Sequence, residues 1–141
     1  MYFWQKKENM IQRIQSIYLT IAGAGALLSA FLFPMWTSQD FDYFASADTV
    51  LFSIVLAVAV ISFIAVFLYK NRSLQMKFCS LNLIVTLAAL AYIAFQYLNY
   101  EAGSTIGVGP FFLILPVIGS ILAKRNIKKD DDLIRSVDRI R

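Results

Sequence analysis

The sequence contains no histidine and only one cysteine, and these two shortages exclude several kinds of chemistry. Histidine is the commonest general base at neutral pH and the commonest metal ligand, so both roles lack their usual residue. The single Cys79 cannot form an internal disulfide, and its position inside a hydrophobic segment is typical of an apolar filler. We therefore expect no metal site, no bound cofactor and no redox role for the thiol.

Long stretches of the chain also lack charged residues, although hydrophobic residues make up 59% of its 141 positions. Uncharged runs lie at about residues 16–36, 50–69, 78–98 and 106–123. A helix of about 20 residues crosses a hydrocarbon core of about 30 Å, and helices satisfy their own backbone hydrogen bonds in lipid. The sequence therefore predicts an all-α membrane protein, a single domain of four transmembrane helices in an antiparallel bundle.

Basic residues are absent from every second loop of this pattern. The 13 Lys and Arg residues all fall before residue 16, between residues 70 and 77, or after residue 123. The other two loops contain only the acids Asp40, Asp42, Asp48 and Glu101. Because Lys and Arg near helix ends remain on the cytoplasmic side, we expect a multi-pass protein of the bacterial inner membrane with both termini in the cytoplasm. The same bias accounts for the sequence pI near 9.3, so we expect no nucleic-acid partner.

Several residues inside the spans indicate how the helices pack. Ala22, Ala26 and Ala30 form a stripe that allows close approach of another helix. Asn82, in the third span, is expected to bond a neighbouring helix rather than a substrate. Pro116 predicts a kink in the fourth span.

The tail from residue 124 to residue 141 lies outside the spans. Its apolar residues Leu133, Ile134, Val137 and Ile140 recur at helical spacing, and Asp130 to Asp132 would cap the start of a helix. This pattern predicts a short, separate amphipathic helix. One interpretation is an anchor held on the bilayer surface by anionic lipid headgroups. The alternative is a docking helix for a protein partner, because Arg135, Asp138 and Arg139 present charges of both signs.

Three segments outside the membrane resemble a family of small four-helix inner-membrane proteins of Bacteroidetes that is catalogued as a domain of unknown function. The matching stretches are MIQRIQSIYL at residues 10–19, YKNRSLQ at residues 69–75 and DLIRSVDRIR at residues 132–141. The resemblance covers the chain from Met10 onward, and it implies Met10 rather than Met1 as the natural start. It implies no substrate, cofactor or catalytic residue.

The absences decide between classes of function. No nucleophile lies in a recognisable arrangement with a base, so we expect no enzyme activity. No span contains an ionisable group of the kind that marks a transport pathway, which leaves a small transporter or channel-like subunit with a kinked fourth helix as the alternative. The favoured interpretation is a small accessory or scaffold protein. It would dock a membrane or cytoplasmic partner through a polar cytoplasmic cluster of Arg13, Arg72, Arg135, Asp138 and Arg139.

Overall fold

The computed structural model describes the backbone of residues 2–99 and 104–139, and side chains from residue 14 onward within those ranges. Four long helices dominate it: α1 (Tyr2–Phe31), α2 (Thr49–Phe67), α3 (Arg72–Asn99) and α5 (Ile114–Asp138). Each contains a stretch long and apolar enough to cross a membrane, which indicates a multi-pass membrane protein. Shorter elements connect them: strands β1 (Pro34–Thr37), β2 (Asp42–Phe44) and β3 (Thr105–Ile106), 3-10 turns η1 (Ala45–Ala47) and η2 (Leu68–Lys70), and helix α4 (Gly109–Phe112).

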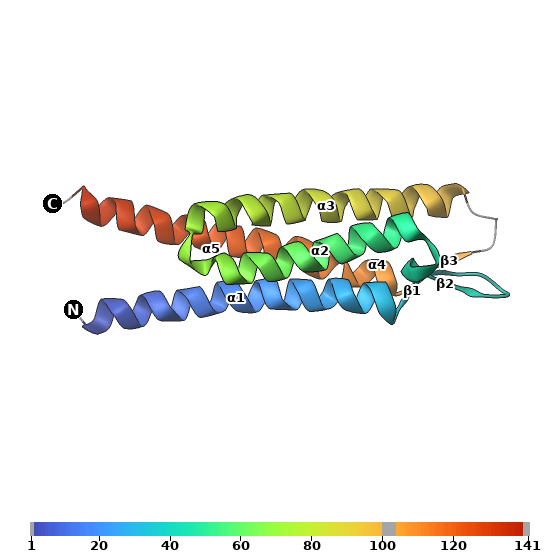
Figure 1. Cartoon of the computed structure of the whole chain (residues 1–141), viewed down its shortest axis with the longest axis horizontal. Helices are drawn as coiled ribbons and strands as arrows, with labels where there is room; N and C mark the ends of the chain where they lie inside the picture. Colours follow the sequence, from blue (N-terminus) through green and yellow to red (C-terminus); the bar gives the residue numbers. More distant parts are fainter. Residues whose placement is uncertain (1, 100–103, 140–141) are drawn as a thin grey trace.

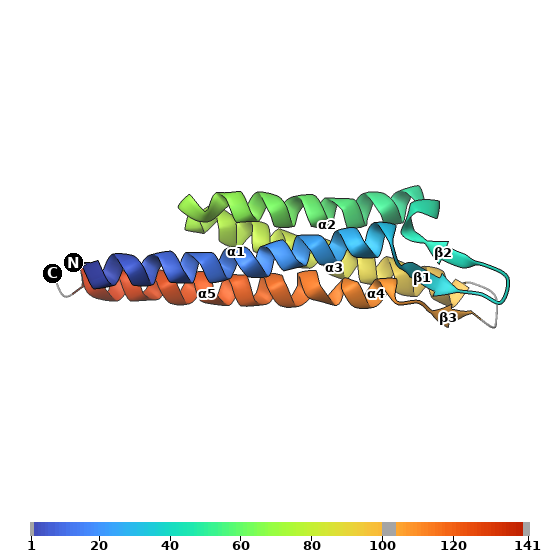
Figure 2. The same ribbon diagram turned by 90° about the horizontal axis from the view of Figure 1, so that it is seen from below.

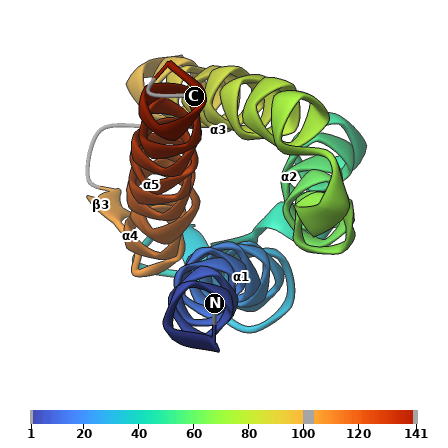
Figure 3. The same ribbon diagram turned by 90° about the vertical axis from the view of Figure 1, so that its left-hand side faces the viewer.

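The four long helices form the bundle that the sequence predicts. Helix α1 packs against α2 and α5, and α3 packs against the same two helices, so that the four surround one core in chain order (Figure 3). The two termini and the α2–α3 connection lie at one end, and the three strands lie at the other (Figures 1 and 2). We call the first the basic end, because Lys70, Arg72 and residues 124–138 of α5 lie there, and the second the acidic end, which carries Asp40, Asp42 and Asp48.

A small antiparallel sheet closes the acidic end, in the strand order β2-β1-β3. We expected the first helix to reach Trp36, but α1 ends at Phe31 and Pro34 begins β1. Proline cannot donate a helical hydrogen bond and disfavours helical geometry at the residue before it, so the chain turns into an extended strand. Gly107 lies directly against β1: its N–H donates to Met35 O at 2.9 Å, and a Cβ there would collide with Pro34 O.

The fourth span is interrupted near Pro116, as the sequence predicts. Helix α4 stops at Phe112, and α5 starts at Ile114. Phe112 lies four residues before Pro116. Proline has no N–H to donate to the carbonyl at that position, and its ring collides with the same carbonyl. The two helices therefore remain separate elements, although together they are long and apolar enough for one membrane crossing.

The prediction of a separate C-terminal amphipathic helix is wrong. Residues 124–138 continue α5 without a break, so the tail shares an axis with the fourth span (Figure 1). No proline or glycine lies between Ala123 and Asp138, and Ile127 is buried against the bundle, so nothing ends the helix at the membrane boundary. The expected cap at Asp130 to Asp132 is wrong for the same reason, since these residues lie inside α5.

The alanine stripe of α1 packs as predicted. Ala22, Ala26 and Ala30 are fully buried among the other helices. The same close packing continues at Gly119 of α5, where an added Cβ would lie 2.8 Å from Tyr18 O. Small residues thus bring α1 and α5 close together, and in lipid such contact supplies much of the energy of helix association.

Candidate functional site

The basic end holds the residues that the sequence proposes as an interaction cluster, and an ion pair fixes its centre. Arg72 Nη2 lies 3.0 Å from Asp130 Oδ2, so the first residue of α3 is tied to α5. Asp130 is buried and the Arg72 side chain is 23% exposed. Charges that are partly removed from water stabilise a structure only when they are paired, so Arg72 has a structural partner within the chain.

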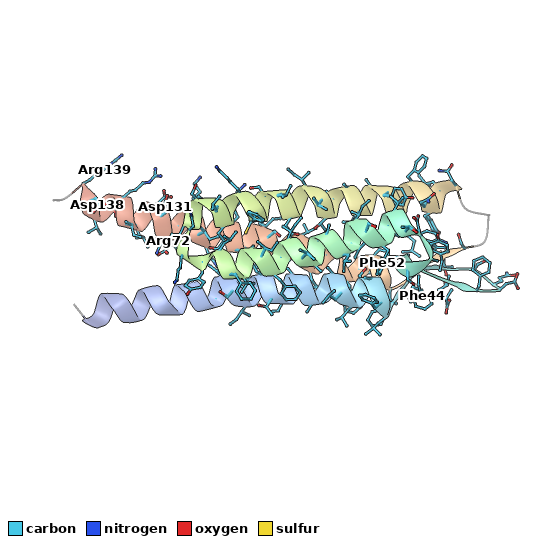
Figure 4. The ribbon with its side chains drawn as sticks, in the orientation of Figure 1. Phe44, Phe52, Arg72, Asp131, Asp138 and Arg139 are labelled. Atoms are coloured by element: carbon cyan, nitrogen blue, oxygen red, sulfur yellow. The ribbon has the colours of Figure 1, made fainter. Side chains whose placement is uncertain are left out.

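Among the side chains that the structure describes, Arg135, Asp138 and Arg139 form no ion pair with Arg72 or with one another. Arg135 pairs with Asp131 on its own helix at 3.2 Å, and 75% of its side chain is exposed. Asp138 and Arg139 are exposed at the far end of α5, beyond Arg72 (Figure 4). Arg13 belongs to α1, but its side chain lies outside the described residues. Of the proposed arginines whose side chains are described, Arg72 and Arg135 therefore pair with acids outside the proposed cluster, and Arg139 lies at the tip of α5.

The end of α5 presents an apolar stripe that becomes exposed. The buried residues Pro116, Ser120, Ala123, Ile127 and Asp130 alternate at spacings of four and three. Two further residues continue this spacing, Ile134 and Val137, and they are 36% and 56% exposed. The stripe changes from buried to exposed after Asp130. Asp130 pairs with Arg72, next to the α2–α3 connection, and α5 continues beyond this connection (Figure 2). The stripe that forms the core inside the bundle is thus a surface outside it.

A second polar centre, which the sequence analysis missed, lies at the acidic end. Asp48 caps α2, with Oδ1 accepting from Val50 N at 2.9 Å and Leu51 N at 3.3 Å. Its Oδ2 accepts from Tyr92 OH at 2.9 Å and Gln96 Nε2 at 3.3 Å on α3. Desolvation raises the pKa of the Asp48 carboxyl, but the bonds from Tyr92, Leu51, Gln96 and Val50 outweigh it and lower the pKa below its usual value. An aspartate just before an apolar run was the sequence signal for this cap.

Asn82 has the structural role that the sequence predicts. Its Nδ2 donates to Ser62 Oγ on α2 and to Ser120 Oγ on α5, each at 2.9 Å. One side chain of α3 therefore connects two other helices. Among the described residues, no three His, Cys, Asp or Glu side chains lie close enough together to hold a metal ion.

Comparison with known proteins identifies a family but no activity. The model of a family described as "Domain of unknown function (DUF4293)" matches residues 11–140. This match includes the three segments 10–19, 69–75 and 132–141, apart from Met10 and Arg141. No curated protein and no solved structure matches the chain.

Proposed function

The chain belongs to the family described as Domain of unknown function (DUF4293), and we propose that it is a small accessory or scaffold protein of a bacterial inner membrane. In this proposal the basic end faces the cytoplasm, since Lys and Arg are retained on that side during insertion. The protein would dock a helix of a partner protein against the exposed stripe of α5, formed by Ile134, Val137 and the adjacent Leu133.

The course of α5 is the observation that carries this proposal. The first charged residues after the span are Lys124 and Arg125, and Val137 lies about 20 Å beyond Lys124 along the helix at 1.5 Å per residue. A lipid anchor must lie in the plane of the interface to bury its apolar side chains. Because α5 continues along the axis of the bundle, Ile134 and Val137 would lie beyond the lipid at that distance. A protein surface is the better-supported cover for them.

Spacing favours a helix as the partner's contacting element. The stripe repeats the three- and four-residue spacing by which α5 packs inside the bundle, and this is the pattern into which helices interdigitate. Exposed Arg139 and Asp138 at the tip would orient the partner, since charge pairs at the rim of an interface contribute specificity more than affinity. Lysines nearer the membrane, such as Lys77, Lys124 and Lys128, would contact anionic headgroups instead.

Site-specific photocrosslinking in intact cells tests the docking. A photoreactive amino acid at Ile134 or Val137 should give one discrete protein adduct, because both side chains face the proposed partner. The matched control positions are Asp132 and Ser136, which lie on the same turns of α5, are equally exposed and belong to the opposite face. They should give little or none of that adduct.

Three outcomes would contradict the proposal. Equal adducts at all four positions would indicate random collision rather than a docked helix, and lipid adducts at Val137 would restore the membrane-anchor interpretation. Loss of the adduct in an Arg135→Lys and Arg139→Lys variant would instead support the proposal, because it would show that the arginine forks specify the contact. A double variant, Leu133→Ser with Ile134→Ser, tests the apolar contact in the same way. If this variant and the Lys variant both retain the adduct, neither the apolar stripe nor the arginines form the proposed contact.

A further inference from the structure

The half of the bundle nearer the basic end buries several polar side chains beside an apolar cluster formed by Leu19, Ala65, Cys79, Ala123 and Ile127. Four of these polar side chains are Ser62 on α2, Gln75 and Asn82 on α3, and Ser120 on α5. The core nearer the acidic end contains large apolar residues, among them Met35, Leu51, Val55 and Leu113, and also buries Ser29. These buried groups are separate from the exposed stripe of α5.

The amide of Asn82 has an oxygen that no described protein group bonds. Ser62 uses its hydroxyl proton on Val58 O at 2.8 Å, so Ser62 Oγ must accept from Asn82. This fixes the NH2 of Asn82 toward the serines and directs Oδ1 elsewhere. Oδ1 is completely buried and receives no hydrogen bond from the described side chains or backbone.

Gln75, two turns earlier on the same face of α3, repeats this arrangement. Its Nε2 donates to Ala65 O at 3.0 Å, near the end of α2. A carbonyl can only accept, so the orientation of this amide is also fixed, and Gln75 Oε1 is left buried without a donor among the described groups. Cys79 lies between the two amides on the same buried face.

Energetics identify the kind of ligand that these oxygens require. Each buried acceptor without a donor costs about 1–3 kcal/mol, and native interiors rarely leave such groups unbonded. A cation would need a compensating negative charge in this low-dielectric interior, and the buried carboxylate of Asp130 is already paired with Arg72. A neutral hydrogen-bond donor of small size meets the requirement without that cost.

We propose that this half of the bundle is a hydrated site, where ordered water donates hydrogen bonds to Asn82 Oδ1 and Gln75 Oε1. The two residues are about 10 Å apart along α3 at 1.5 Å per residue, so more than one water molecule is needed. Buried waters of this kind usually make about three hydrogen bonds to otherwise unsatisfied groups.

Radiolytic hydroxyl-radical labelling of the full chain in detergent tests the site, because radicals formed from bound water oxidise adjacent sulfur side chains. The chain offers a matched pair of buried sulfurs: Cys79 beside the two amides, and Met35 in the apolar core. After correction for the intrinsic reactivity measured in the unfolded chain, Cys79 should be oxidised several-fold faster than Met35. Equal protection of the two would overturn the proposal.

Two variants extend the test. Replacing both amides, Gln75→Leu with Asn82→Leu, should lower Cys79 oxidation to the level of Met35, and unchanged oxidation in the folded variant would overturn the proposal. If that variant does not fold, the comparison of Cys79 with Met35 in the unaltered chain decides. Titration with sodium, potassium or ammonium chloride distinguishes the ligand: protection of Cys79 that saturates with one cation, and not with choline chloride, would assign the site to that cation instead of water.

Discussion

At the scale of single residues, a carboxylate joins neighbouring elements at each end of the bundle. Asp48 accepts four hydrogen bonds from α2 and α3 at the acidic end, and Asp130 forms an ion pair with Arg72 at the basic end. Both carboxylates join neighbouring elements of the bundle. The exposed Arg135–Asp131 pair is of a different kind, because pairs four residues apart on a helix surface contribute only about 0.3–0.5 kcal/mol.

The bonds of Asp48 predict a loss of stability in acid. Its folded-state pKa is lowered, so its contribution is fully present above the unfolded value near 4 and is lost as the pH falls through the folded value. Thermal unfolding in detergent, followed by circular dichroism from about pH 6 to about pH 3, should show a falling midpoint below about pH 4. Asp48→Ala should cost about 1 kcal/mol or more at neutral pH, since it removes the α2 cap.

Tyr92→Phe provides the control for this prediction. It removes one hydrogen bond to the carboxylate and preserves the cap, so it should reduce the loss in acid without abolishing it. If Asp48→Ala and the unaltered chain lose stability equally below about pH 4, the acid sensitivity arises from other groups.

At the scale of elements, the contact between α1 and α5 depends on glycine. A Cβ at Gly119 would meet the backbone oxygen of Tyr18 at 2.8 Å and Ala22 Cβ at 3.0 Å, and neither atom can move without shifting a helix. At Gly23 the nearest atoms belong to the Phe63 ring, at 2.9–3.2 Å, and a side chain can rotate away. The two glycines thus differ in what opposes a larger residue.

This difference predicts opposite outcomes for the same substitution. Gly119→Ala should destabilise the bundle by about 1–2 kcal/mol, because overpacking exceeds the gain in helix propensity of about 1 kcal/mol. Gly23→Ala should be neutral or slightly stabilising. Unfolding midpoints in the same detergent give the comparison, and equal effects of the two substitutions would show that the α1–α5 contact is looser than the structure indicates.

At the scale of the whole molecule, all described basic residues lie in one half of the bundle and the sheet closes the other (Figures 1 and 2). Both α1 and α5 extend past the α2–α3 connection at the basic end, so two helices of four project from the domain. This shape offers a surface where a partner helix could complete the bundle. The proposed orientation places that surface in the cytoplasm.

Reporter fusions test the orientation. Alkaline phosphatase, which is active only outside the cytoplasm, should be active when fused after Asp42 or Glu101 and inactive after Arg141, because positive charge retains the basic end inside. A fluorescent protein that matures in the cytoplasm should give the inverse pattern. Activity of the phosphatase after Arg141 would reverse the orientation and remove the cytoplasmic docking proposal with it.

The sequence by itself determined which segments form the long helices, because an uninterrupted apolar run must bond its own backbone in lipid and only a helix does so locally. It also predicted the interruption at Pro116, the burial of the alanine stripe and the interhelical bonds of Asn82, all of which are confirmed. These features depend on residue type and spacing along one segment.

Only the tertiary structure decided how those segments meet. Arg72 pairs with Asp130, and Asp48 accepts from Tyr92, each across more than 40 residues of sequence. The energy of a hydrogen bond or ion pair depends on the distance between its atoms, and spacing along the chain does not give that distance. The sequence predicts a separate helix for the tail because the composition of the chain changes after Ala123. A helix, however, ends where its backbone geometry or capping changes, and between Ala123 and Asp138 neither does.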